Sequence, residues 1–85
     1  MNTINWLPKA LRQLRKIEVK QAAKIRFAVT SELADLNQAR NVKALTGHAH
    51  GYRLRIGSYR VFFEYDGSIR IVTIEEVRKR DERTY

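Results

Sequence analysis

The chain has 85 residues, of which 44% are hydrophobic and 31% charged, and its formal net charge is +8 at pH 7. This length predicts one folded domain over residues 1–85 with no room for a second core. The absence of cysteine excludes disulfides and thiolate chemistry. There is no run of about 18 apolar residues and no signal-peptide pattern, so we expect a cytoplasmic protein that does not enter a membrane.

The positive charge favours nucleic acid as a partner, because Lys and Arg that neutralise phosphates release condensed counterions. An acidic protein partner would be equally compatible with this positive charge. Residues 8–36 hold seven basic and three acidic groups, whereas residues 51–85 hold eight basic and six acidic groups. A focused site in the second segment must therefore depend on how its charges are arranged rather than on their number.

A short strand and two helices are predicted first. Residues 3–6 suit a strand, and Pro8 suits the first turn of a helix, where its missing N–H has no partner. A second, longer helix is expected over about residues 18–36, with Phe27 in the core. The two apolar stripes are Leu7, Leu11, Leu14 and Ile17, then Ala22, Ile25, Val29, Leu33 and Leu36. No Gly or Pro separates the helices, so a bent rod and an antiparallel hairpin both fit, and the hairpin would pack better on a small sheet.

Residues 37–50 form a polar connector, in which residues 42–45 suit an extended segment. Its end carries His48 and His50, whose spacing puts both on one side of an extended chain. Histidine is the usual proton carrier near neutral pH, so this pair could supply a base, although loop histidines without a catalytic role are commoner. No third ligand of suitable spacing favours a metal site.

The next segment is a hairpin with an apolar face and an arginine face. Period-two alternation over residues 52–65 predicts two half-buried strands around Gly57 and Ser58. Gly at the first place of a two-residue connection suits a type II′ turn, which pairs Arg55 with Arg60. Like charges directly opposite are destabilising, so this pair suggests a polyanionic ligand that offsets the repulsion.

A second turn signal, Asp66-Gly67 of type I′, leads into a last strand over about residues 68–77. That turn would place Thr73 opposite Arg60. The element order is β-α-α-β-β-β. It predicts an α+β domain with a small, twisted, mainly antiparallel sheet and two helices packed on one face.

The charged residues of the last strand allow different roles. Glu75 and Glu76 are adjacent and should point to opposite faces, which argues against a carboxylate dyad. Strict alternation would send Arg78 into the core, so a bulge or the strand end must intervene. If the arginine face is only a solvated surface, Glu64 and Glu75 would pair with its arginines at little net energy.

Residues 45–85 carry an ordered set of short motifs. They comprise a Leu-x-Gly element, a Tyr-basic-x-basic strand, a Gly-x-Tyr-Arg-hydrophobic strand and a C-terminal basic-Arg followed by Tyr. In this chain they read LTGHAHGYRLRIGSYRVFFEYDGSIRIVTIEEVRKRDERTY. In order and spacing the segment resembles the RelE/ParE toxins of bacterial toxin–antitoxin pairs. The helical half is similar to that family in length and character only.

The resemblance implies a toxin that a cognate antitoxin wraps around and holds inactive. Arg53 and Arg55 fall where RelE toxins have two lysines. Arg60 and Arg80 fall where they have arginines, and Tyr85 where they have a C-terminal tyrosine. This match favours the RelE branch and implies a ribosome-dependent endoribonuclease, an mRNA interferase that needs no cofactor. Its partners would be mRNA in the ribosomal A site and ribosomal RNA, and its cut would leave a 2′,3′-cyclic phosphate.

The chemistry of these residues suggests their roles. Attack by an RNA 2′-OH needs a base, stabilisation of the phosphorane and protonation of the leaving 5′-oxygen. The planar fork of arginine suits the second task, but its pKa above about 12 makes it a poor base. We therefore assign a phosphate clamp to Arg53, Arg55, Arg60 and Arg80, and positioning or proton transfer to Tyr85. Weak acid–base chemistry follows, so the ribosome would have to align the substrate.

Two other functions fit the same sequence. A ParE-like toxin would poison DNA gyrase without nuclease activity and would need the arginines only for its fold or partner surface. A non-catalytic basic RNA-binding domain would use the same charge. Codon-phased cuts in mRNA would favour the interferase, whereas inhibited supercoiling would favour the gyrase poison.

Overall fold

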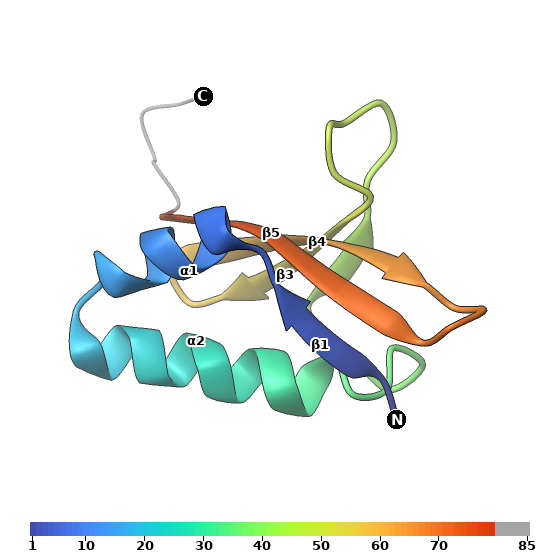
Figure 1. The fold of residues 1–85 in the computed structure, drawn as a ribbon, viewed down its shortest axis with the longest axis horizontal. Helices are drawn as coiled ribbons and strands as arrows, with labels where there is room; N and C mark the ends of the chain where they lie inside the picture. The colour runs from blue at the N-terminus through green and yellow to red at the C-terminus, as the bar shows by residue number, and fades with distance from the viewer. Residues whose placement is uncertain (80–85) are drawn as a thin grey trace.

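A computed structural model describes residues 1–79 as a five-stranded sheet with two helices on one face (Figure 1). The strands are β1 Thr3–Trp6, β2 Val42–Ala44, β3 Tyr52–Ile56, β4 Tyr59–Asp66 and β5 Ile71–Lys79. Their spatial order is β1-β5-β4-β3-β2, with β1 parallel to β5 and the other pairs antiparallel. The predicted α+β architecture is confirmed, with the short strand β2 added at one edge.

The helices are separate and antiparallel: α1 Pro8–Arg15 and α2 Val19–Glu32 (Figure 1). The chain leaves the helical path at Glu18, whose ψ is 141°. Ile17 in this turn packs against the core, which explains how the helices separate without Gly or Pro. The predicted end of the second helix near residue 36 is wrong, because α2 ends at Glu32, yet Leu36 still packs against the core.

The core lies between the helices and the facing side of the sheet. Its buried side chains are Ala10, Leu14, Ala22, Ile25, Val29, Leu33, Leu54, Val61, Phe63, Val72, Ile74 and Val77. Phe63 is fully buried and stacks on Tyr52, with ring centroids 5.3 Å apart. The expectation for Phe27 is wrong, because its side chain lies on the outer side of α2 and is 75% exposed.

The β3–β4 hairpin has the predicted register. Ile56 pairs with Tyr59 and Arg55 with Arg60. Gly57 has a φ of 54°, as the first central residue of a type II′ turn requires. The alternation and the turn residues therefore agree on one register, which fixes the side of the sheet that each side chain occupies.

Gly57→Ala is expected to lower the free energy of unfolding by about 1–2 kcal/mol. A Cβ at this position would meet no atom within 4 Å, so the whole effect comes from placing an L side chain at positive φ. Urea denaturation followed by Trp6 fluorescence would measure it. Ser58→Ala is the control and should change stability by less than about 0.5 kcal/mol. Equal losses in the two variants would contradict the turn assignment.

The turn between β4 and β5 differs from the prediction. Asp66 pairs with Ile71, so the connection is residues 67–70 and not a two-residue type I′ turn. The Oδ1 of Asp66 accepts hydrogen bonds from the N–H of Ser68 at 3.0 Å and from its hydroxyl at 2.6 Å. Arg70 adopts the positive φ, at 55°. The aspartate thus stabilises a wider loop than its Gly neighbour suggested.

The wider loop and a β-bulge change which residues face each other. Arg60 lies opposite Arg78, and not opposite Thr73 as expected. The register shifts between Phe62 and Phe63, leaving Glu75 as the extra residue of β5. A bulge was one of the two predicted ways to keep Arg78 out of the core, and it is the one observed.

Candidate functional site

Three arginines form a row across three neighbouring strands. Arg55 on β3 lies opposite Arg60 on β4, which lies opposite Arg78 on β5. Their chain neighbours Leu54, Val61 and Val77 belong to the core, so the arginines occupy the face away from the helices. Arg55 and Arg78 are exposed, and Arg60 is half-buried. We call these three residues the arginine row.

Arg53 belongs to the next row on the same face. It pairs with Lys43 on β2 and with Phe62 on β4. Its Nε is buried and has no hydrogen-bond partner within the described part of the chain. A buried donor left in this state costs about 1–3 kcal/mol, so an incoming acceptor would gain by bonding to it.

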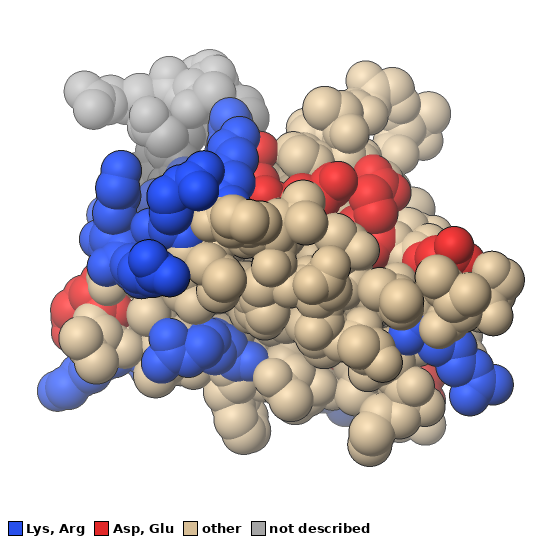
Figure 2. All heavy atoms as spheres, viewed as in Figure 1, with Lys and Arg blue, Asp and Glu red and all other residues tan. Residues whose placement is uncertain are grey.

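The arginine face adjoins a basic surface on α1. Figure 2 shows Lys and Arg side chains gathered over this helix, where Lys9, Arg12, Arg15 and Lys16 are exposed. The Nζ of Lys9 lies 3.6 Å from Glu76 Oε1 on β5, which joins the two basic regions. A long polyanion could therefore contact both the helix and the sheet.

The carboxylates of Glu75 and Glu76 meet at one histidine, so the prediction that they point apart is wrong. His50 Nδ1 lies 2.7 Å from Glu75 Oε1, and His50 Nε2 lies 2.9 Å from Glu76 Oε2. Glu76 Oε1 also accepts a 2.5 Å hydrogen bond from Arg78 Nε. The bulge at Glu75 explains this convergence, because an extra residue breaks the alternation of side chains along β5.

The acidic partners suggested for a solvated arginine surface are used elsewhere. Glu64 accepts a hydrogen bond from the N–H of Gly51 at 2.7 Å. Glu75 binds His50, and Arg78 is paired with Glu76. Among the ion pairs of residues 1–79, the pairing of Glu64 and Glu75 with arginines is therefore not the arrangement observed, although Arg78 of the row does hold the carboxylate of Glu76.

Burial and bonding act in opposite directions on His50 and on Glu76. Burial lowers the pKa of His50, but hydrogen bonds to Glu75 and Glu76 and their negative charges outweigh it, so the pKa is raised above 6.5. Burial raises the pKa of Glu76, but hydrogen bonds from Arg78 and His50 and the charges of Arg78 and Lys9 hold it below 4.5. Both shifts favour the ion pair between His50 and its carboxylates.

The stability that His50 contributes should fall at alkaline pH. A raised folded-state pKa means that this contribution is complete below about pH 6.5 and is lost as pH rises through the raised value. We expect the difference in unfolding free energy between wild type and His50→Gln to shrink from pH 6 to pH 9 in urea titrations. A difference that stays constant or grows would contradict the ion pair.

A loop carrying both histidines covers part of the same face. Residues 45–51 rise from the sheet on the side opposite α2 (Figure 1), and the N–H of Leu45 donates to the carbonyl of Gly51 at 2.9 Å. The ring of His48 stacks on Phe62 with centroids 5.4 Å apart, and His50 stacks on the same ring at 5.1 Å. This covering explains why Phe62 is only 6% exposed despite facing away from the core.

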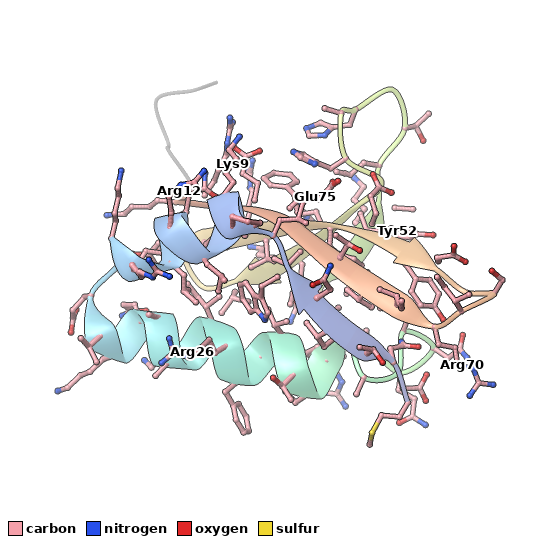
Figure 3. All side chains as sticks on the ribbon, viewed as in Figure 1. Lys9, Arg12, Arg26, Tyr52, Arg70 and Glu75 are labelled. Atoms are coloured by element: carbon pink, nitrogen blue, oxygen red, sulfur yellow. The ribbon has the colours of Figure 1, made fainter. Side chains whose placement is uncertain are left out.

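A cavity of about 350 Å³ lies beneath the loop and beside the arginine row. Its lining residues are Gly47, His48, Ala49, His50, Phe62, Glu76 and Arg78. We call it the histidine pocket. Figure 3 shows Glu75 on β5 and Lys9 on α1 at the side of the molecule from which the loop rises.

The predicted site residues fall into two groups. Arg53, Arg55 and Arg60 share one face of the sheet. Arg80 and Tyr85 lie outside the described residues. Arg78 was not among the assigned residues. The available signal for the bulge was that strict alternation would have sent Arg78 into the core.

The described range, residues 1–79, lacks two features that mark other classes of protein. No helix in that range is long and apolar enough to cross a membrane. The same range contains no group of three or more His, Cys, Asp or Glu side chains arranged to hold a metal ion.

Comparisons with solved structures identify the fold. A chain of the RelBE2 toxin–antitoxin complex of Mycobacterium tuberculosis is 25% identical with a TM-score of 0.82, over 93% of this chain and 98% of that one. A chain of the intact RelBE complex of E. coli is 18% identical with a TM-score of 0.76, over 96% and 100%. One from the RelE–RelB complex of Pyrococcus horikoshii is 17% identical with a TM-score of 0.72, over 95% and 97%. The last two establish the fold alone.

The family is established by sequence. No curated protein matches the chain. Residues 4–84, however, match the model of the family described as the ParE toxin of the type II toxin–antitoxin system parDE. That match spans nearly the whole sequence and agrees with the RelE fold of the structural relatives. The chain therefore belongs to the RelE/ParE superfamily of type II toxin–antitoxin toxins.

Proposed function

We propose that this toxin is a ribosome-dependent endoribonuclease of the RelE type, which stops translation by cutting mRNA in the ribosomal A site. The observation that carries the proposal is the arginine row of Arg55, Arg60 and Arg78, on the sheet face that the helices leave open. Like charges side by side are unfavourable unless an anion offsets them. Glu76 does so for Arg78, and phosphate is an anion that the guanidinium fork also fits in bidentate geometry.

The spacing of the row suits a single RNA linkage. Neighbouring strands lie about 4.8 Å apart, so the three arginine Cα atoms span roughly 10 Å. Side chains from the outer strands can bend toward the central Arg60 and surround one phosphate. The buried Nε of Arg53 adds a donor from the next row.

Cleavage would proceed by in-line attack of the 2′-oxygen on the adjacent phosphorus. The bond from O2′ to phosphorus forms as the bond from phosphorus to O5′ breaks, leaving a 2′,3′-cyclic phosphate and a 5′-hydroxyl. Negative charge develops on the non-bridging oxygens, and Arg55 and Arg60 would donate hydrogen bonds to them. Arg80 would join the clamp and Tyr85 would position the nucleotide or carry a proton, as the family resemblance implies.

The base is not provided by His50 in the observed arrangement. Both its ring nitrogens bind carboxylates, which leaves neither free to take the proton of a 2′-OH. The arginines are equally unsuited, since their pKa exceeds about 12. Weak acid–base chemistry fits a toxin whose substrate is aligned by the ribosome, because alignment alone can supply much of a rate enhancement.

An antitoxin is the second proposed partner. The structural relatives include RelB–RelE complexes from M. tuberculosis, E. coli and P. horikoshii. By analogy, a cognate antitoxin would wrap this chain and keep mRNA and ribosomal RNA from the arginine row.

Primer extension tests the proposal. Purified toxin is added to ribosomes programmed with a defined mRNA, and the products are mapped alongside toxin with mRNA alone. We expect cuts in phase with the reading frame that require ribosomes and end in a cyclic phosphate. Absence of cuts, under conditions where the toxin still arrests growth, would refute it.

Poisoning of DNA gyrase is a second candidate, because the matching family model is described as a ParE toxin. In this case the arginine row would serve the fold or bind the antitoxin. A supercoiling assay with purified gyrase separates the two functions. Inhibited supercoiling together with intact mRNA would favour the gyrase poison.

A further inference from the structure

We infer that the histidine pocket receives one unstacked nucleobase of the RNA, with His48 and Arg78 as its stacking walls and His50 as a positioning residue. The inference rests on the proposed function, since it concerns the RNA whose phosphate the arginine row would hold. It adds a recognition site for a base to a surface otherwise suited only to phosphates.

The size and the walls of the pocket favour a planar ring. Its volume of about 350 Å³ lies at the small end of ligand sites, which suits a single nucleoside rather than a peptide. His48 is exposed and already stacks on Phe62, so one ring face is anchored and the rest of the imidazole is available. Proteins that read single-stranded RNA stack its bases on such rings and on guanidinium planes.

The histidine pocket directly adjoins the arginine row. Arg78 lines the pocket and also belongs to the arginine row. A base in the pocket would therefore be attached to a sugar next to the phosphate over Arg60. Phosphate contacts carry no sequence information, whereas base contacts do, so the pocket would determine which nucleotide flanks the cut.

The acidic groups beside the histidine pocket are paired with basic ones. Two carboxylates beside a phosphate site would repel RNA if they were unpaired. Here His50 binds both Glu75 and Glu76, and Glu76 also binds Arg78 and Lys9. Protonated His50 thus neutralises the site and ties residues 45–51 to β5, which keeps the pocket walls in place.

The groups that face His50 set its pH dependence. Glu75, Glu76 and Arg78 reach it from β5, Lys9 from α1 through Glu76, and His48 from its own loop, while β4 presents the uncharged Phe62. Loss of the His50 proton leaves two carboxylates on a neutral ring. The neutral ring can donate to only one of them, so the loop should be held less tightly to β5 and the base contact should weaken as pH rises.

The test compares two RNAs that differ by one base. Toxin affinity is measured for a short 2′-deoxy-blocked RNA and for the same RNA with an abasic residue at each position in turn. For wild type we expect removal of one particular base to weaken binding by roughly 5- to 150-fold, the range for a base stacked on an aromatic ring. In His48→Ala that ratio should fall toward one, while the abasic RNA binds both proteins equally well.

Arg55→Ala is the matched control on the arginine row. It should weaken binding of both RNAs by the same factor, leaving their ratio unchanged. For wild type, the ratio at pH 6 should exceed that at pH 9, and His50→Gln should abolish this difference. A ratio of one at every position of the wild-type complex would overturn the pocket.

The pocket and the nuclease proposal can fail separately. Binding ratios need neither ribosomes nor cleavage, so a base-dependent ratio without codon-phased cuts would retain the pocket and remove the nuclease. Cuts with no base-dependent ratio, and with the same positions cut by His48→Ala, would retain the nuclease and remove the pocket.

Discussion

Replacing Arg60 by alanine should lower the rate of the proposed ribosome-dependent mRNA cleavage by about 10²- to 10³-fold. Arg60 is the middle residue of the arginine row, with Arg55 and Arg78 on either side. Removal of a donor aimed at transition-state charge typically costs about 2.7–4 kcal/mol of activation free energy. Single-turnover cleavage on programmed ribosomes measures the rate, and arrest of growth on induction should disappear with it.

Two further variants make this result specific. Arg60→Lys keeps the charge but loses the bidentate fork, so it should recover only part of the rate. Arg26→Ala removes an equal charge from the exposed side of α2 (Figure 3) and should cleave at nearly the wild-type rate. Urea denaturation must show that Arg60→Ala is folded. Retained growth arrest in both Arg60→Ala and Arg80→Ala would remove the assignment of the site.

Phe63→Ala should lower the free energy of unfolding by about 3–5 kcal/mol. Phe63 has no exposed surface and lies in the core cluster against Tyr52. Truncation loses its transfer free energy and leaves a cavity that the surrounding side chains fill only in part. Small domains have about 5–15 kcal/mol of stability in total, so much of this variant should be unfolded at 37 °C.

Phe27→Ala provides the matched control. It makes the same change of side chain at a position that is 75% exposed, where an effect within about 0.5 kcal/mol is expected. Urea unfolding followed by far-UV circular dichroism would compare the two variants. Similar losses at both positions would contradict the burial of Phe63 and the exposure of Phe27.

Strand alternation and turn residues predicted those parts of the fold that depend on interactions between residues close in sequence. The β3–β4 register followed from alternation and one Gly in the turn, and Arg55 accordingly lies opposite Arg60. The predicted turn of the β4–β5 hairpin was wrong, because Asp66 accepts hydrogen bonds from Ser68 and stabilises a longer loop than the Asp-Gly pair suggested. A turn signal of two residues does not exclude a longer connection.

The site was harder to predict than the fold, because its charges meet over long sequence separations. His50 lies far along the chain from Glu75 and Glu76, and only the bulge brings both carboxylates to its ring. The strand pattern predicted that some irregularity must turn Arg78 outward, but not that it would gather two acids. Phe27 was wrongly expected in the core. Ala22, Ile25 and Val29 form the buried face of α2, and Phe27 lies on its exposed side.

The parallel pairing of β1 with β5 has a consequence for synthesis in the cell. The first strand of the chain is joined to the last one described, with Thr3 beside Ile71 and Trp6 beside Ile74. A nascent chain that emerges from its N-terminus cannot close the sheet until β5 has been translated. Arg78 is also part of β5, so nascent chains that have not yet reached β5 would lack both the closed sheet and a full row of arginines.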